Sequence, residues 1–135
     1  MAGPGVIFTG FQFGESYEEL RSNCFIYVQS TEVGGTHPAL VEGMTYGNCI
    51  IANDVPEHRE VLADCGLYYP KNDFDALSKV LESLSSDLSK VQEYGRRAKE
   101  FAAKHYDWNS ICEQYETLFS SKASAAPKTS VITMS

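Results

Sequence analysis

A glycine pair followed closely by a proline could build an anion-binding site between residues 30 and 44. Gly34-Gly35 would let the backbone turn tightly and approach a ligand, and Pro38 suits the first position of a helix. The start of a helix presents unpaired amides and a partial positive charge, which together favour a phosphate group. Glu42 would lie one turn inside that helix, where its carboxylate could accept hydrogen bonds from a sugar diol beside the phosphates.

Each of these residues also has a plain structural interpretation. The glycine pair could be an ordinary strand-to-helix turn, and Glu42 a solvated helix residue. His37 titrates near neutrality in model peptides and could donate to a phosphate or carry a proton, yet it could equally cap the helix. Asp54 and Glu57 could line the same crevice or only cap a loop.

The elements needed to position these groups alternate between short apolar strands and helices. The pattern predicts strands at 6–8, 24–28, 49–52 and 67–69, and helices at 17–21, 39–46 and 57–62, the first of them capped by Ser16. This alternation is typical of an α/β fold, with a doubly wound, Rossmann-like parallel sheet and flanking helices. The loops at 10–14, 30–37 and 53–56 then follow the carboxyl ends of strands, where such sheets bind ligands.

The second half of the chain is predicted to be helical. Asp73 could cap a helix with an apolar stripe, a second helix spans residues 91–102, and Asp107 could cap a third. The basic side chains of the second helix are expected on a solvated face. We interpret residues 1–119 as one partial domain and residues 120–135 as a disordered tail.

Composition excludes several classes of function. The formal net charge of −7 disfavours nucleic-acid binding, which needs a basic surface. No apolar run is long enough to span a membrane and no signal peptide is evident, so a cytoplasmic location is expected. No metal site is expected, because neither the histidines nor the carboxylates have ligand spacing. His58 and His105 are expected at the surface. The four cysteines form no Cys-x-x-Cys pair and are expected to be free thiols, mostly buried; they are Cys24, Cys49, Cys65 and Cys112.

Several segments together resemble a known family. The order and spacing of these segments are similar to those of the C-terminal part of retaining glycosyltransferases of the GT-B fold (glycosyl transferase group 1), which use nucleotide-diphosphate sugars. The sequence of residues 33–38 resembles most closely that of a bacterial, rhamnosyltransferase-like subgroup. The resembling segments are 6–10, 30–44, 47–54, 60–61, 64–70, 106–108 and 115–119.

The resemblance implies roles for individual residues. Glu42 takes the place of the glutamate that binds the ribose hydroxyls. The family has a second glutamate eight positions earlier, which often contacts the transferred sugar; here that position is Gly34. Glu32 is the nearest carboxylate and the candidate catalytic residue, and His37 is the alternative contact to the sugar. Gly10 and Phe11 would belong to the loop that holds the base. The remaining donor-binding positions, most of them offering backbone amides to the diphosphate, are Gly34, Gly35, Thr36, His37, Ala39 and Leu40.

The resemblance also implies an activity for the parent enzyme. It would transfer a hexosyl or deoxyhexosyl group, with retention and without a cofactor, to a glycan or lipid-linked acceptor in polysaccharide assembly. It would work in the cytoplasm, at the inner face of the membrane. The N-terminal GT-B domain and the family's Arg and Lys for the leaving diphosphate are absent from the resembling segments, so the isolated chain is expected to be inactive. The alternative is a non-catalytic nucleotide-binding or interaction module, and an aromatic stripe on the third helix could support a homo-oligomer.

Overall fold

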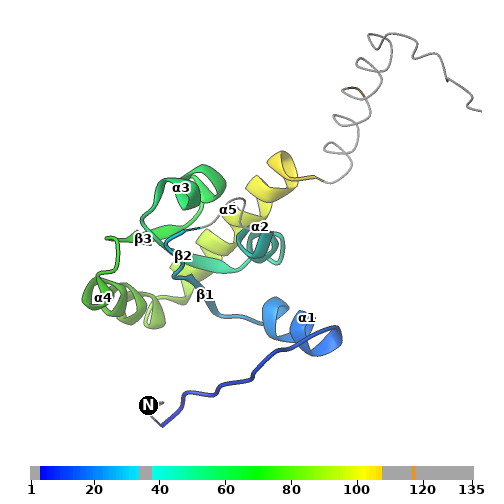
Figure 1. Ribbon diagram of the computed structural model, residues 1–135. Helices are drawn as coiled ribbons and strands as arrows, with labels where there is room; N and C mark the ends of the chain where they lie inside the picture. Colours follow the sequence, from blue (N-terminus) through cyan, green and yellow to red (C-terminus); the bar gives the residue numbers. More distant parts are fainter. Residues whose placement is uncertain (1–3, 34–37, 108–116, 118–135) are drawn as a thin grey trace, which may run out of the picture.

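A computed structural model describes residues 4–33, 38–107 and 117 of the chain, in which helices surround a small parallel sheet. Three strands and five helices alternate along the described chain, which confirms the predicted class (Figure 1). The predicted third helix after Asp107 and the predicted tail lie almost entirely outside the described residues. In chain order the elements are α1 (Glu15–Ser22), β1 (Ile26–Gln29), α2 (Pro38–Thr45), β2 (Cys49–Asn53), α3 (Pro56–Leu62), β3 (Leu67–Tyr69), α4 (Phe74–Ser85) and α5 (Leu88–His105).

The strands form a parallel sheet in the order β1-β2-β3. Ile26 pairs with Cys49 at the start of the β1–β2 ladder, and Asn53 pairs with Tyr69 at the end of the β2–β3 ladder. Every residue of β2 is buried, as expected for a parallel strand that is covered on both faces. The carboxyl ends of all three strands therefore meet at one edge of the sheet.

Alternate side chains of β2 pack into two hydrophobic cores, one on each face of the sheet. On one face, Ile50 and Ala52 pack against α2, α3 and α5. On the other face, Cys49 and Ile51 pack against β3, α4 and the beginning of α5. This two-sided burial explains why the strand reads as an unbroken apolar run in the sequence.

Helix α5 passes very close to the turn between α2 and β2. Gly47 occupies this turn with φ of 77°, a left-handed conformation that ends α2 where the sequence predicted. Gly95 faces it from α5, and a Cβ atom added at Gly95 would overlap the carbonyl oxygen of Gly47. The pair of glycines thus sets the distance between α5 and the α2–β2 turn.

The predicted first strand is wrong. Residues 6–8 form no strand: Ile7 and Phe8 are each 83% exposed. The segment before α1 runs away from the sheet (Figure 1). An apolar sequence forms a strand only where a neighbour pairs with its backbone, and β1 is paired only with β2 in the described part of the chain.

Smaller corrections concern the first helix and the second predicted strand. Helix α1 begins at Glu15, after Gly14, and no side-chain cap bond is formed, so Ser16 does not cap it. Strand β1 runs from Ile26 to Gln29, two residues later at its start than predicted. None of the described helices is both long and apolar enough to cross a bilayer.

Candidate functional site

The candidate site lies at the edge where the three parallel strands end. The chain leaves β1 at Ser30, leaves β2 at Asp54 and leaves β3 at Pro70. Helix α2 begins at Pro38, as predicted, on the connection between β1 and β2. In parallel α/β sheets this edge is where ligands bind, because the connecting loops leave a crevice there.

Glu42 is held by two side chains from α1. The Tyr17 hydroxyl donates a hydrogen bond of 2.7 Å to Glu42 Oε2, and Arg21 Nη2 lies 3.7 Å from the same oxygen. Because Tyr17 donates to a carboxylate, its own pKa is raised. The Glu42 side chain remains 37% exposed, so the carboxylate is oriented but still open to solvent.

Arg21 connects α1 to α2 and β1 at once. Its guanidinium lies 4.2 Å from the centre of the Tyr27 ring and donates to the carbonyl oxygen of Ala39. Ala39 and Leu40 lie in the first turn of α2, where backbone amides have no partner within the helix. Of the predicted anion-binding residues, these two are in the described part of the chain; Gly34, Gly35, Thr36 and His37 lie outside it.

Glu32 is exposed, and it accepts a hydrogen bond at Oε1 from the side-chain amide of Asn72. Asn72 follows β3 and has φ of 60°, a left-handed conformation that asparagine tolerates better than most residues. Glu32 and Glu42 thus have hydrogen-bond partners in different parts of the chain: Glu32 bonds to Asn72 after β3, and Glu42 bonds to Tyr17 on α1. No contact between them is among those described.

His58 was predicted at the surface, and this prediction is wrong. Its side chain is fully buried, with Nδ1 2.7 Å from the carbonyl oxygen of Asn53 and Nε2 3.3 Å from Thr31 Oγ1. The helix beginning at Pro56 turns this residue toward the ends of β1 and β2, which a single sequence cannot reveal. His105 is exposed, as predicted.

Asp54 makes a bidentate ion pair with Arg59, with one bond of 2.7 Å between Oδ2 and Nη2. The guanidinium lowers the pKa of the Asp54 carboxyl. Glu57 is exposed on the first turn of α3. The Asp54 carboxylate thus pairs with an arginine of α3 and forms no cap of that helix, and its place in the crevice stays a prediction.

The predicted base loop lies apart from this edge. Gly10 and Phe11 precede α1, and Phe11 is 92% exposed and stacked on Phe13. The strand that should have placed them at the sheet edge is not formed. Their role with the base stays a prediction.

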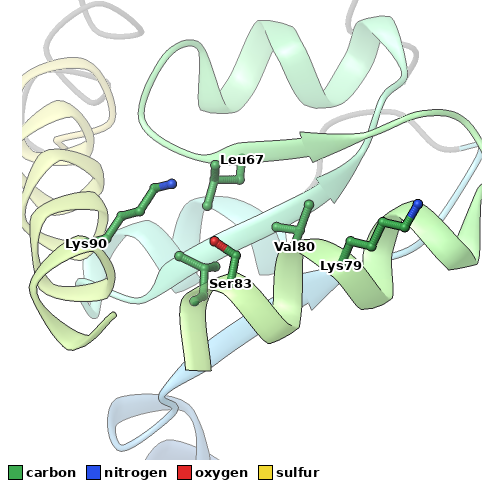
Figure 2. Close-up of a pocket in the computed structure, with 6 residues that line it drawn as sticks. Leu67, Lys79, Val80, Ser83 and Lys90 are labelled. Carbon is green, nitrogen blue, oxygen red and sulfur yellow. The ribbon is translucent and has the colours of Figure 1, made fainter. Parts of the chain in front are cut away.

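A hollow of about 210 Å³ lies elsewhere, at the other edge of the sheet. Figure 2 shows Leu67 at the start of β3, Val80 and Ser83 on α4, and Lys90 directed toward Leu67 from the start of α5. None of the predicted site residues lines it. Among the described residues, no three His, Cys, Asp or Glu side chains are grouped as a metal would require. Cys49 and Cys65 are buried free thiols, as predicted, and Cys24 is half-buried.

Sequence reasoning missed four polar residues at this edge. Tyr17 and Arg21 are four positions apart, and this spacing on a helix places two side chains on one face, so it was an available signal. Asn53 and Asn72 had no such signal, because their partners are distant in sequence.

Comparison with known proteins identifies the family of the chain. The family described as glycosyl transferases group 1 matches residues 1–87. A phosphatidyl-myo-inositol mannosyltransferase from Mycolicibacterium smegmatis is 31% identical over 94 residues, which cover 68% of this chain and 24% of the relative. An uncharacterized glycosyltransferase from Methanocaldococcus jannaschii is 25% identical over 118 residues, covering 85% of this chain and 30% of the relative.

Solved structures show the same fold. HepE from Anabaena in complex with UDP superposes with a TM-score of 0.73 at 19% identity, over 81% of this chain and 31% of HepE. Sucrose-phosphate synthase from Thermosynechococcus elongatus superposes with a TM-score of 0.77 at 19% identity, over 85% of this chain and 30% of the synthase. The chain thus spans less than a third of the length of each of these proteins. It belongs to the group 1 family of glycosyl transferases and has the fold of the C-terminal part of a GT-B glycosyltransferase.

Proposed function

We propose that this chain is the donor-binding portion of a glycosyltransferase that moves a sugar from a nucleotide-diphosphate sugar to a glycan or lipid-linked acceptor. The observation that carries the proposal is the Glu42 carboxylate, which Tyr17 and Arg21 hold in place while it stays open to solvent. Membership of the family and the fold shared with HepE, whose structures contain UDP and UDP-glucose, support it.

In this proposal each part of the edge has a separate task. Glu42 accepts hydrogen bonds from the two ribose hydroxyls, using the lone pairs that Tyr17 leaves free. The amides of Ala39 and Leu40, with the positive end of the α2 dipole, receive the diphosphate. Glu32 faces the transferred sugar in place of the glutamate that the family has at the position of Gly34.

The finer properties of the parent enzyme are also proposals. They are retention at the anomeric carbon, a hexosyl or deoxyhexosyl donor, and action in polysaccharide assembly in the cytoplasm at the inner membrane face. The rhamnosyltransferase-like assignment stays a prediction. For the isolated chain we expect donor binding without turnover, because the resemblance places the Arg and Lys for the leaving diphosphate outside the motifs found here.

Calorimetric titration with UDP, GDP, ADP and dTDP tests the proposal. The wild-type chain should bind one of them saturably, and the result names the base. Glu42→Ala should weaken that binding about 30-fold, equivalent to about 2 kcal/mol, because hydrogen bonds to a charged group contribute about 1.5–3 kcal/mol each. Glu42→Gln should fall between the two, because it keeps the shape of the side chain and loses its charge.

Two control variants separate binding from folding. Tyr17→Phe removes the bond that ties α1 to Glu42 but leaves the carboxylate, so nucleotide affinity should be kept while stability falls. Glu82→Ala removes an exposed carboxylate from α4, which carries none of the predicted site residues, and should change neither. Equal affinity of wild type and Glu42→Ala, or no binding by the wild type, would contradict the proposal and favour the interaction module.

A further inference from the structure

A chain of hydrogen bonds that all run in one direction passes through His58 to the carbonyl oxygen of Asn53. The carbonyl oxygen of Asn53 can only accept, so His58 Nδ1 carries a hydrogen, and in the neutral ring Nε2 is then an acceptor. Thr31 therefore donates its hydroxyl hydrogen to Nε2. Behind it, Gln29 Nε2 donates to Thr31 Oγ1 over 2.7 Å, and the Tyr27 hydroxyl donates to Gln29 Oε1.

A second set of bonds leads from the same asparagine to Glu32. The Asn72 amide donates to Asn53 Oδ1 over 3.1 Å, and Asn53 Nδ2 donates to Asn72 Oδ1 over 3.3 Å. The left-handed backbone of Asn72 allows both bonds, and its side-chain amide then donates to Glu32. Asn53 thus lies behind both Thr31 and Glu32, through two different partners.

The burial of this cluster needs an explanation. Asn53 and His58 are both fully buried, and buried polar groups are costly unless they are hydrogen-bonded. Two apolar side chains of similar volume would fill the same space without this requirement. The two sets of bonds include the exposed residues Thr31 and Glu32, which precede the Gly34-Gly35 pair by a few positions in the sequence. We therefore infer that the cluster serves to order this surface segment, since an apolar core would fill the same space without needing these hydrogen bonds.

We propose that the buried Asn53 and His58, together with the exposed Asn72, form a hub that positions Thr31 and Glu32, so that the Glu32 carboxylate is held toward the donor sugar. The hub residues are positioning residues and contact no substrate themselves. The inference rests on the proposed function for its ligand, but the order of the segment can be measured without one.

The ligand-free arm uses the full 135-residue chain with 15N-labelled histidine. The imidazole spectrum should show His58, identified by its loss in His58→Gln, with the hydrogen on Nδ1. Thr31→Val should shift the Nε2 signal and raise amide exchange at Glu32 several-fold, because the hydroxyl donor is lost. Thr31→Ser keeps the donor and should restore both signals.

The ligand arm compares UDP-glucose with UDP by calorimetry. Thr31→Val should weaken UDP-glucose about two- to tenfold, the effect of one hydrogen bond, and change UDP affinity less, because only the sugar reaches Glu32. Asn72→Gly keeps the left-handed backbone and deletes the side chain that holds Glu32, so it should act in the same direction. Thr45→Val is the matched control, because that hydroxyl donates within α2 to the Val41 carbonyl oxygen, its one hydrogen bond in the described part of the chain.

The outcomes separate this inference from the proposed function. A hydrogen on Nε2 of His58, or unchanged exchange at Glu32 in both Thr31→Val and Asn72→Gly, would overturn the hub. So would an equal loss of UDP and UDP-glucose affinity in these variants. Failure of the wild type to bind either ligand would reject the proposed function alone, because the imidazole and exchange measurements still decide whether the hub orders the segment.

Discussion

Replacing Gly95 by alanine should destabilise the domain, although alanine is the better helix former. The new methyl group would overlap the carbonyl oxygen of Gly47, which is backbone and cannot rotate away. Overpacking typically costs about 1–3 kcal/mol, and we take the upper end for a backbone obstacle. The intrinsic preference of a helix for alanine returns about 1 kcal/mol. The net loss in the free energy of unfolding is therefore about 2 kcal/mol.

Gly43 supplies a matched control, because it is also a buried helical glycine. The three nearest atoms to a methyl group there all belong to side chains: Tyr27 Cδ1 at 3.2 Å, and Arg21 Nη2 and Ile50 Cδ1, both at 3.5 Å. These side chains can shift by a few tenths of an ångström, so the packing cost and the propensity gain should nearly cancel. We expect Gly43→Ala to be close to wild type in stability.

Urea unfolding followed by far-UV circular dichroism measures both variants, with equal m-values as the check that the unfolded state is unchanged. For a chain of this length, about 2 kcal/mol corresponds to a fall in Tm of about 6–10 °C. The reasoning fails if Gly95→Ala is as stable as wild type. It also fails if Gly43→Ala loses as much, since the loss would then not depend on the close passage of α5 over the α2–β2 turn.

Two further predictions concern a thiol and a helix cap. Burial raises the pKa of Cys49 to about 11, whereas the thiol of the unfolded chain ionises near pH 9. The unfolded chain is therefore stabilised relative to the folded one as the pH rises from about 9 to about 11. The free energy of unfolding, measured by urea unfolding, should fall by about 1–2 kcal/mol between about pH 8.5 and 10.5, after allowance for screening. In Cys49→Ala the free energy of unfolding should depend less on pH across the same range. The Asp73 carboxylate accepts a hydrogen bond of 2.9 Å from the Ala76 amide at the start of α4, so Asp73→Ala should cost about 1 kcal/mol in thermal unfolding; an unchanged Tm would show that the cap contributes nothing.

The position of Glu42 illustrates a competition that the sequence does not reveal. A ribose would share the carboxylate with Tyr17 and Arg21, which already occupy Oε2. In the proposed function, the bonds from α1 orient the carboxylate and also use part of its capacity to accept hydrogen bonds from the ribose. This is why Tyr17→Phe is expected to separate stability from nucleotide affinity.

Local pattern alone determined much of this protein. Four features depend on neighbours within a few residues, and each was predicted correctly, with the strand one residue longer than expected. They are the apolar run 49–52, the glycine after α2, Pro38 at the start of α2 and the Asp73 cap. Their order along the chain was enough to predict a parallel α/β sheet with its ligand edge at the carboxyl ends of the strands.

Tertiary structure decided the features that need a partner far along the chain. Residues 6–8 have the composition of a strand but form none, because a strand exists only through pairing. His58 looks like a surface residue in a polar helix, yet α3 packs it against the ends of β1 and β2. The contacts of Glu42 and Glu32 with Tyr17 and Asn72 span 25 and 40 positions, so spacing could not predict them. Hydrogen bonds between distant segments have no sequence period, and only the folded chain brings their donors and acceptors together.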